Sequence, residues 1–521
     1  MTKLTYFRHK VLKIKLKLVI LRLIHQNLNM KTKFKLIILF FLTVFAFQSC
    51  QDNDDVSAPL NLEVNDFIWK GLNLYYLWQA DVPNLSDNKF ATQTQLNNFL
   101  SGYPKPENLF ESLLYKPESL YPAAGQAVDR FSWIVDDYLE LEGQLQGTTN
   151  NNGVEFGLSY KSSGSSEIIG WVRYIIPNSN ASTKNIKRGD VFYGVNGTQL
   201  TVSNYQALLF GSNNDYTLNM ADINGGAFTP NGKTVALTKT ILDENPILVN
   251  KVIVSGSHKI GYLMYNAFYG NYDTQLNDAF GSLKSQGITD LVLDLRYNGG
   301  GSIQTATRLA SMITGQFKGQ VFSKEQWNAK IESYFAANDP ESLKNLFTDK
   351  MGTTAINSVG MTKVYILTSA STASASELVI NGLKPYITVV QIGDLTTGKN
   401  VGSVTLYDSP TFGKENRNPS HRYAMQPLVL KIVNGAGFGD YQSGLVPTFA
   451  LKETLSTLDV LGSTTEPLLN LAIGKITGTA RTKQSTPGIQ FEYFKDSKSI
   501  NGLRNQMYLD KAPEGLLKAL E

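Results

Sequence analysis

The stretch of sequence that decides the fold is Leu-Val-Leu-Asp-Leu-Arg-Tyr-Asn-Gly-Gly-Gly, from Leu291 to Gly301. Its first five residues are apolar except for Asp294, which is typical of a strand buried on both faces of a sheet. Such strands belong to parallel sheets whose connections are helices. A second run of this kind, Val364–Leu367, is followed by small residues and a helical pattern. We therefore predict a mixed α/β core over residues 244–475.

Two further regions are expected before this core. Residues 146–243 contain short strand patterns, of which Val154–Tyr160 is the clearest, and the pair Asn196-Gly197 is a strong hairpin signal. We predict a small β-rich domain there. Residues 61–145 are predicted to be a helical region, because apolar residues first recur there at helical spacing. Residues 476–521 are polar and irregular, and we predict a C-terminal tail with no recognisable chemistry.

The charges of the chain are unevenly distributed. Of its 521 residues, 42% are hydrophobic and 18% charged, and the formal net charge is +4. Residues 1–49 hold ten of the 48 Lys and Arg residues and no Asp or Glu, so the remainder carries 38 basic and 44 acidic residues. The composition indicates a folded protein rather than a disordered one. With a net charge of −6 after the leader, no nucleic-acid partner is expected.

Residues 1–49 are predicted to be a signal peptide. Three lysines, Lys31, Lys33 and Lys35, precede the 12-residue apolar run Leu36–Phe47. This run is too short to span a bilayer but has the length of a signal-peptide core. Because a signal peptide of the usual form begins at Met30, residues 1–29 are interpreted as the result of a start codon assigned too far upstream.

Cys50 is the only cysteine, so no intramolecular disulfide can form. The segment Ala46–Cys50 resembles a bacterial lipobox, which implies that Cys50 becomes a lipidated N-terminus on a tether over residues 50–60. The acidic run Gln51–Asp55 resembles the surface-export signals of Bacteroidetes-type lipoproteins. We therefore expect a cell-envelope lipoprotein, attached by its lipid to the outer membrane on the periplasmic or cell-surface face. An unmodified thiol is the alternative interpretation.

Several classes of site are not expected. Only two histidines, His258 and His421, follow Cys50, and both lie in turn-like sequence, so neither a metal site nor a metal cofactor is expected. The sequence contains no Gly-x-Ser-x-Gly elbow and no phosphate-binding loop of the form Gly-x-x-x-x-Gly-Lys-Ser/Thr. No other cofactor is indicated.

Two motifs contain the residue types of a nucleophile and a base. Thr372-Ala-Ser-Ala-Ser-Glu377 lies between a buried strand and a helix, and Gly393-Asp-Leu-Thr-Thr-Gly-Lys399 follows it. Small side chains let a ligand approach the backbone, and a serine at a helix start has free N–H groups beside it. Either motif alone is also typical of an ordinary helix cap or polar turn.

Together with Leu293–Gly301, which precedes them in the chain, these two motifs make three. In this order the three resemble the motifs of the carboxyl-terminal processing (tail-specific) serine proteases. In that family the nucleophile is the third residue of the Ser motif and a lysine follows 25 residues later. The matching residues here are Ser374 and Lys399. The resemblance implies a protease core of the tail-specific, crotonase-like type, no cofactor, and serine endopeptidase activity on envelope proteins.

The resemblance extends to the β-rich region. Segments Ile176–Ala181 and Ile186–Val191 resemble sequence motifs of the PDZ domain that family members carry. It implies that a substrate C-terminus binds as an extra strand along Phe156, Gly157 and Leu158. The expected partners are therefore polypeptides, captured by their C-termini.

A serine hydroxyl is a weak nucleophile until a base takes its proton. Lysine has an ordinary pKa of about 10.4 and is charged at neutral pH, but burial lowers this value. We therefore expect Lys399 to be buried and within reach of Ser374. Two backbone N–H groups should stabilise the oxyanion. We predict that of Ala375 and one from the glycine-rich turn, Gly300 in preference to Gly299.

The chain departs from the family pattern at three positions. Ser403 replaces the Gln that usually orients the lysine and is expected to support it, Asn400 replaces a Gly, and Pro385 replaces an acidic residue. Glu377 is expected to support the site as a first-turn helix anion. Asp294 and Arg296 are interpreted as a structural pair. These departures leave two alternatives: a catalytically impaired PDZ lipoprotein that acts as a binding scaffold, and a hydrolase of a different acyl substrate.

Overall fold

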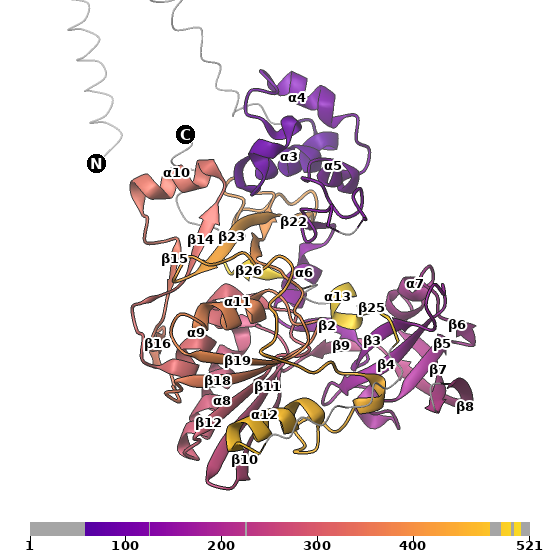
Figure 1. The fold of residues 1–521 in the computed structure, drawn as a ribbon. Helices are drawn as coiled ribbons and strands as arrows, with labels where there is room; N and C mark the ends of the chain where they lie inside the picture. The colour runs from indigo at the N-terminus through magenta and orange to yellow at the C-terminus, as the bar shows by residue number, and fades with distance from the viewer. Residues whose placement is uncertain (1–57, 124, 225–226, 480–490, 502–504, 512–521) are drawn as a thin grey trace, which may run out of the picture. The chain divides into compact units, whose positions relative to one another are not determined.

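The computed structural model describes residues 58–123, 125–224, 227–479, 491–501 and 505–511 (Figure 1). The predicted signal peptide, Cys50 and most of the tether lie outside these residues. The chain divides into two compact units, of which the smaller comprises residues 1–60 and 90–98. Apart from residues 93–98 of one helix, everything described below belongs to the larger unit, residues 61–89 and 99–521. Among the described helices, none is long and apolar enough to cross a bilayer.

The core is built on a six-stranded sheet with the order β10-β11-β12-β18-β19-β24. From β11 to β24 neighbouring strands are parallel, and β10 joins at the edge as the antiparallel partner of β11. Four residues of the predicted buried strand, Leu291–Asp294, lie in β12 at the centre of this sheet. The strands are β10 (Ile247–Ser255), β11 (His258–Tyr265), β12 (Asp290–Asp294), β18 (Lys363–Thr368), β19 (Thr388–Gly393) and β24 (Phe449–Ala450).

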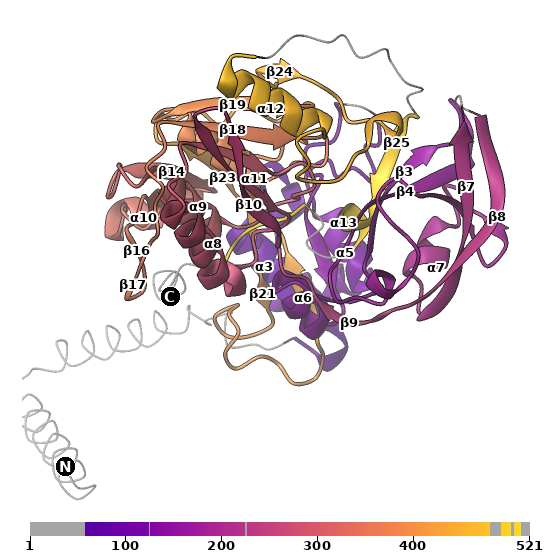
Figure 2. The ribbon, with the colours of Figure 1, turned by 90° about the horizontal axis from the view of Figure 1, so that it is seen from below.

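Helices lie on both faces of this sheet, which explains its continuous apolar strands. On one face, α12 (Pro467–Thr477) packs Leu468 and Leu469 against Tyr262 and Val292. Figure 2 shows α12 above β18 and β19, with α8 and α9 on the other side of the sheet. The helices of that side are α8 (Asp273–Ser285), α9 (Ile303–Thr314) and α11 (Ala375–Leu383). The α/β core is thus confirmed.

A second six-stranded sheet completes the core, with the order β13-β26-β20-β23-β14-β15. Its strand β26 comes from the predicted C-terminal tail and pairs in parallel with both β13 and β20. The strands are β13 (Gly301–Ser302), β26 (Met507–Leu509), β20 (Val401–Val404), β23 (Leu428–Asn434), β14 (Val321–Trp327) and β15 (Lys344–Leu346); beyond it lie α10 (Ala329–Asn338) and the short pair β16 (Lys350–Met351) and β17 (Thr354–Ala355).

The predicted β-rich domain is a twisted antiparallel sheet around its own apolar cluster, which includes Phe156, Leu158, Phe192 and Leu218. Its base is closed by β2 (Thr148–Asn151) and β9 (Thr240–Asp243), which pair with each other close to the predicted boundaries 146 and 243. The other elements are β3 (Val154–Tyr160), β4 (Ile168–Ile175), β5 (Val191–Val195), β6 (Thr198–Gln199), α7 (Tyr205–Phe210), β7 (Asp215–Asn224) and β8 (Ala227–Thr238). The predicted strand Val154–Tyr160 and the hairpin at Asn196-Gly197 are both present.

The N-terminal region is largely helical, with α3 (Glu63–Tyr75), α5 (Pro106–Ser112) and α6 (Tyr138–Leu145). Helix α4 (Gln93–Leu100) begins in the smaller unit. Between α5 and α6 the chain forms β1 (Trp133–Val135), which pairs with β22 (Ala424–Gln426) of the core; β21 (Leu406–Tyr407) completes this three-stranded sheet. This pairing brings the residues just before β1 to the core.

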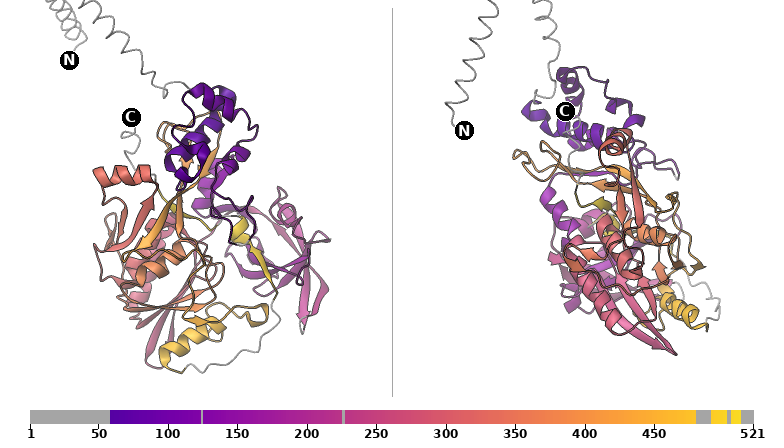
Figure 3. Two further views of the ribbon diagram at one scale, coloured as in Figure 1. Left: turned by 45° about the horizontal axis from the view of Figure 1, so that its top comes forward. Right: turned by 90° about the vertical axis from the view of Figure 1, so that its left-hand side faces the viewer.

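The prediction of a tail after residue 475 is wrong. The described residues 491–501 and 505–511, here called the C-terminal segment, form β25 (Tyr493–Asp496), α13 (Ser497–Ile500) and β26. Strand β25 adds to the β-rich sheet beside β3, and β26 enters the core. Figure 3 shows this segment in yellow between the magenta domain and the core. These strands of four and three residues are too short to show the alternation that predicts a strand.

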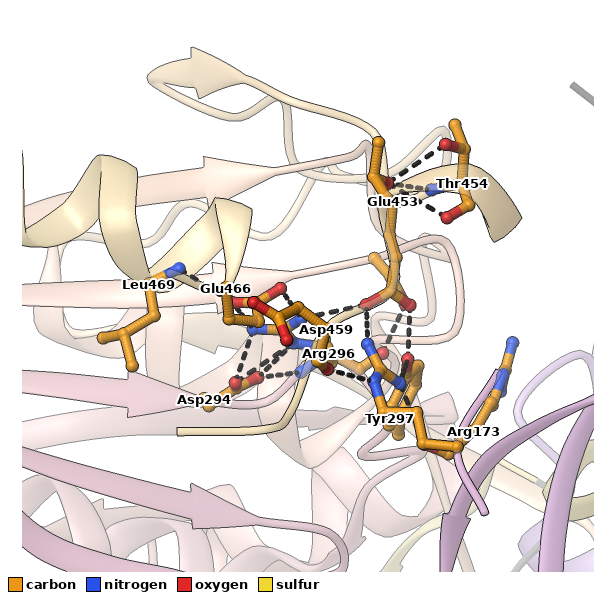
Figure 4. A network of polar contacts seen from close by, with 12 residues as sticks. Arg173, Asp294, Arg296, Tyr297, Glu453, Thr454, Asp459, Glu466 and Leu469 are labelled. Carbon is orange, nitrogen blue, oxygen red and sulfur yellow. Dashed lines mark hydrogen bonds and ion pairs between the residues drawn. The ribbon is translucent and has the colours of Figure 1, made fainter. Parts of the chain in front are cut away.

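A fully buried guanidinium connects the two domains (Figure 4). Arg296 binds Asp294 and both oxygens of Glu466, with distances between 2.6 and 3.0 Å. Its Nη1 also donates to Glu453 at 2.9 Å, and Glu453 in turn binds Arg188 of the β-rich domain at 2.6 Å. The predicted structural pair of Asp294 and Arg296 is confirmed, within a larger network.

The network has a defined pH dependence. Burial alone would raise the pKa of Glu453, but Arg188 and Arg296 lower it to about 2. A carboxyl group whose pKa falls on folding stabilises the protein above its unfolded pKa of about 4.3. This stabilisation is therefore lost as the pH falls from about 4.3 towards 2.

Replacing Glu466 with Ala should reduce the free energy of unfolding by about 3–5 kcal/mol, because Arg296 would keep its burial and lose a bidentate partner. Glu466 also accepts the N–H of Leu469 at the start of α12, which adds to the loss. Urea unfolding at neutral pH measures the change. The matched control, Glu415→Ala at an exposed position, should stay within about 0.5 kcal/mol. A loss below 1 kcal/mol for Glu466→Ala would contradict the assignment.

Candidate active site

Ser374 lies on the sharp turn between β18 and α11, immediately before the first residue of the helix. Its backbone has φ 66° and ψ −119°, a region that non-glycine residues rarely occupy and that concentrates at functional sites. The residue is fully buried. In the described part of the chain, Oγ has no hydrogen-bond partner. The strained, buried hydroxyl thus faces the N–H of Glu377 in a capping-box arrangement but makes no hydrogen bond of good geometry there.

Glu377 joins the two predicted catalytic residues. Its Oε2 accepts the backbone N–H of Ser374 and that of Lys399, each at 2.8 Å. Its Oε1 accepts the N–H of Gly398 at 2.7 Å and the hydroxyl of Thr396. Burial nevertheless raises the pKa of this carboxyl group. The predicted first-turn helix anion therefore has a second role, because it also holds the loop that carries the lysine.

Lys399 is fully buried, as predicted. This burial lowers the pKa of its amine well below the ordinary 10.5. Its Nζ donates to Oε1 of Gln506 at 2.9 Å and lies 4.6 Å from the centre of the Phe131 ring. The amine is not hydrogen-bonded to Ser374 Oγ in this structure.

The glycine-rich turn lies directly against the nucleophile. A Cβ on Gly300 would be 2.6 Å from Cβ of Ser374, and the φ of Gly300 is +110°, so no other residue fits there. The turn is fixed to the nucleophile loop through the carbonyl of Asn298, which accepts the N–H of Ala373 at 3.1 Å and the hydroxyl of Ser376 at 3.0 Å.

The N–H groups of the two predicted oxyanion donors differ in their partners. Ala375 is the first residue of α11, where an N–H has no acceptor within the helix. The N–H of Gly300, however, donates to Oδ1 of Asn298 at 2.9 Å and is not free. The N–H of Gly299 has no acceptor among the described residues.

Ser403 is expected to support Lys399, and in the structure it reaches the lysine only through Gln506. Its hydroxyl donates to Gln426 at 2.5 Å and makes a longer hydrogen bond of 3.5 Å to Oε1 of Gln506. The acceptor for Lys399 is Gln506, which lies 107 residues further along the chain. Sequence analysis missed Gln506 because no motif or spacing relates it to the lysine. The only signal in the sequence was that Ser403 stands where a Gln usually orients the lysine, so the acceptor had to come from elsewhere.

The predicted peptide-binding edge of the β-rich domain is occupied by the chain itself. Strand β25 pairs antiparallel with β3, with Lys495 opposite Leu158 and Asp496 opposite Gly157. The backbone N–H of Phe156 donates to Ser497 Oγ at 3.0 Å. In this conformation, a substrate C-terminus would first have to displace β25.

No group of three or more His, Cys, Asp or Glu side chains in the described residues is arranged to hold a metal ion. One small cavity of about 90 Å³ lies beside the nucleophile loop and is lined by Trp171, Tyr297, Ala370 and Ser371, among others. It lies where the β-rich domain meets the core.

Comparison with protein families gives two matches in this chain. The model described as peptidase family S41 matches residues 259–409, which include the three motifs, and the peptidase S41 N-terminal domain matches residues 63–133. The second match covers most of the helical region before β1.

Two curated proteins and one solved structure illustrate the similarity. The chain is 28% identical over 169 residues to a carboxyl-terminal-processing protease from Picosynechococcus sp., covering 32% of this chain and 36% of that protein. It is 24% identical over 295 residues to a chloroplastic C-terminal processing peptidase from Tetradesmus obliquus, covering 53% and 59%. The chain thus spans between about a third and three fifths of these relatives.

A crystal structure described as a putative S41 protease from Bacteroides fragilis is 25% identical and has a TM-score of 0.60; the match covers 80% of this chain and 98% of that one. Its fold agrees with the mixed α/β architecture found here. Residues 63–133 and 259–409 of this chain therefore match the two domains of peptidase family S41, and the chain is similar to the carboxyl-terminal-processing proteases.

Proposed function

We propose that this protein is a serine endopeptidase in which Ser374 is the nucleophile and Lys399 the general base. The observation that carries the proposal is that a single oxygen of Glu377 accepts the backbone N–H groups of both residues. Two residues 25 positions apart are thereby held side by side. One has an unpartnered hydroxyl and the other a buried amine with a lowered pKa.

The proposed reaction follows from these groups. The neutral amine of Lys399 takes the hydroxyl proton while Ser374 Oγ attacks the peptide carbonyl carbon, forming a tetrahedral intermediate with a negative oxygen. The resulting ammonium then gives that proton to the leaving amine as the C–N bond breaks, which leaves an acyl-serine. Water, deprotonated by the same amine, hydrolyses the ester and restores the serine.

The negative oxygen requires backbone donors aimed at it. The N–H of Ala375 follows the nucleophile and is the first donor. We assign the second donor to Gly299 rather than Gly300, because the N–H of Gly300 already donates to Asn298. Removing one donor of this kind typically costs about 3–4 kcal/mol in the transition state.

We further propose that polypeptide substrates bind along the edge of β3 at Phe156, Gly157 and Leu158, in the manner of a PDZ domain. The support is that this edge already accepts an antiparallel strand, β25. Phe494 of that strand packs on Tyr160 and Tyr205 with ring centres 5.3 Å apart in each case. A peptide with an apolar residue at the equivalent place would make the same contacts.

The location of the protein is proposed from its leader alone. The predicted signal peptide and the lipobox-like segment that ends at Cys50 favour a lipid-anchored protein of the cell envelope. Envelope proteins are therefore the proposed substrates. A binding scaffold remains the alternative if the serine proves inactive.

Cleavage of casein by the full chain should depend on Ser374. We expect Ser374→Ala to reduce the rate by a factor on the order of 10³ or more, because no other hydroxyl replaces the nucleophile. Gel analysis of the digest over time measures the loss. The matched control is Ser333→Ala on an exposed face of α10, which should retain full activity. Equal cleavage by wild type and Ser374→Ala would refute the assignment of the nucleophile.

The pH–rate profile should report Lys399. Because the base must be uncharged, kcat/KM is expected to rise with pH as the ammonium loses its proton, with a midpoint well below 10.5. Lys399→Arg, which stays charged, should be inactive throughout, whereas Lys324→Arg at an exposed position of β14 should follow the wild-type profile. A wild-type profile with its only rise near 10.5 would contradict a buried lysine base.

Peptide binding at the β3 edge should compete with β25. Replacing Phe494 with Ala removes its two aromatic contacts, which destabilises the internal strand and should tighten binding of a labelled peptide with an apolar C-terminus roughly tenfold. Fluorescence anisotropy measures this affinity. Phe438→Ala, at a half-exposed position outside the domain, is the control and should have no effect. Unchanged affinity for Phe494→Ala would exclude this edge as the peptide site.

A further inference from the structure

The C-terminal segment contacts both sides of the candidate active site. On the nucleophile side, Oδ2 of Asp496 accepts the hydroxyl of Ser371 at 2.7 Å and a hydrogen bond from Arg173 at 2.9 Å. Ser371 lies three residues before the nucleophile. On the base side, Gln506 accepts a hydrogen bond from Lys399. A part of the chain that lacks any recognised motif therefore borders both catalytic residues.

The side chain of Gln506 is held in a single orientation. Its Oε1 accepts Lys399 Nζ at 2.9 Å, and its Nε2 donates to the carbonyl of Phe131 at 3.0 Å. Because both ends of the amide are bound, the oxygen and not the nitrogen faces the amine. Gln506 is almost fully buried. Its own backbone carbonyl also lies against the glycine turn, 2.8 Å from where a Cβ of Gly300 would be.

We propose that Gln506 is the positioning residue for Lys399, and that the active site is complete only when the C-terminal segment is in place. This inference rests on the proposed roles of Ser374 and Lys399. It assigns to Gln506 the direct contact with the lysine, while Ser403 contacts only the same Gln506 oxygen, at 3.5 Å.

The chemistry of the amide fits this task. A neutral amine has two N–H groups and one lone pair, and a hydrogen bond to Gln506 fixes one N–H so that the lone pair can be directed. A carboxylate would hold the amine too, but it would favour the charged form. The charged groups that act on Lys399 are Asp129 and Glu377, which favour the ammonium, and Arg130, which opposes it. Because the amide of Gln506 is neutral, it does not add to the stabilisation of the ammonium by Asp129 and Glu377.

The position of Gln506 indicates a permanent part of the site rather than a removable plug. The next residue begins β26, which lies between β13 and β20 in the core sheet. Met507 is fully buried and Tyr508 nearly so. Removing Gln506 from the site would therefore mean extracting a strand from the middle of a sheet.

The test uses the full chain with Gln506→Ala and the nearly isosteric Gln506→Glu. The substrate is a casein-derived fluorogenic peptide. We expect Gln506→Ala to lower kcat about 10- to 100-fold with little change in KM, because Lys399 loses its orientation while substrate binding is unaffected. For Gln506→Glu, the rise of kcat/KM should move to higher pH, since a carboxylate stabilises the ammonium. Gln326→Ala and Gln326→Glu, at an exposed position of β14, are the matched controls and should match wild type.

A second measurement does not depend on proteolysis. The lysine ε-carbons, labelled with ¹³C, are titrated by NMR in wild type and Gln506→Glu, with Lys399→Ala assigning the resonance. A midpoint for Lys399 that is higher in Gln506→Glu supports the proposal even if no substrate is cleaved. An unchanged midpoint overturns it, as does an unchanged or increased kcat for Gln506→Ala. Cleavage that survives Ser374→Ala would instead show that the proposed nucleophile is wrong.

Discussion

The rest of the site depends on one buried carboxylate. Glu377 accepts hydrogen bonds from the backbone of Ser374, from that of Lys399 and from that of Gly398, so a helix start and a distant loop share one anchor. An unpaired carboxylate in this position would be costly, and its burial is tolerated because donors surround both oxygens. The same contacts orient the nucleophile turn and the lysine loop before any substrate is present.

The structure separates the buried charges that support the fold from those proposed to do chemistry. Arg296 is surrounded by carboxylates and stays charged, which ties the core to the β-rich domain through Glu453 and Arg188. Lys399 is buried as deeply but faces an amide and an aromatic ring. Burial without a directly bonded carboxylate is what lowers its pKa, because the charged form then lacks compensation.

Chain topology makes the candidate site a composite of distant segments. The nucleophile and base come from the core, Phe131 comes from the N-terminal region, and Gln506 comes from the C-terminal segment. That segment also forms β25 on the β-rich domain, so the proposed peptide edge and the proposed catalytic lysine are both contacted by residues close together in sequence.

The sequence by itself determined the α/β core, the β-rich domain, and the residues Ser374, Glu377 and Lys399. These features leave local signals, because apolar runs, hairpin turns and fixed motif spacings all lie within short windows. Only the tertiary structure decided that Gln506 and not Ser403 meets the lysine, that the N–H of Gly300 is already bonded, and that β25 covers Phe156–Leu158. The contacts of Gln506 and β25 depend on strand pairing between residues far apart in the chain, and strands of three or four residues are too short to carry a local trace of their partners. The bond of Gly300 is local, to Asn298 two residues before it, but the orientation of that side chain is set only in the folded protein.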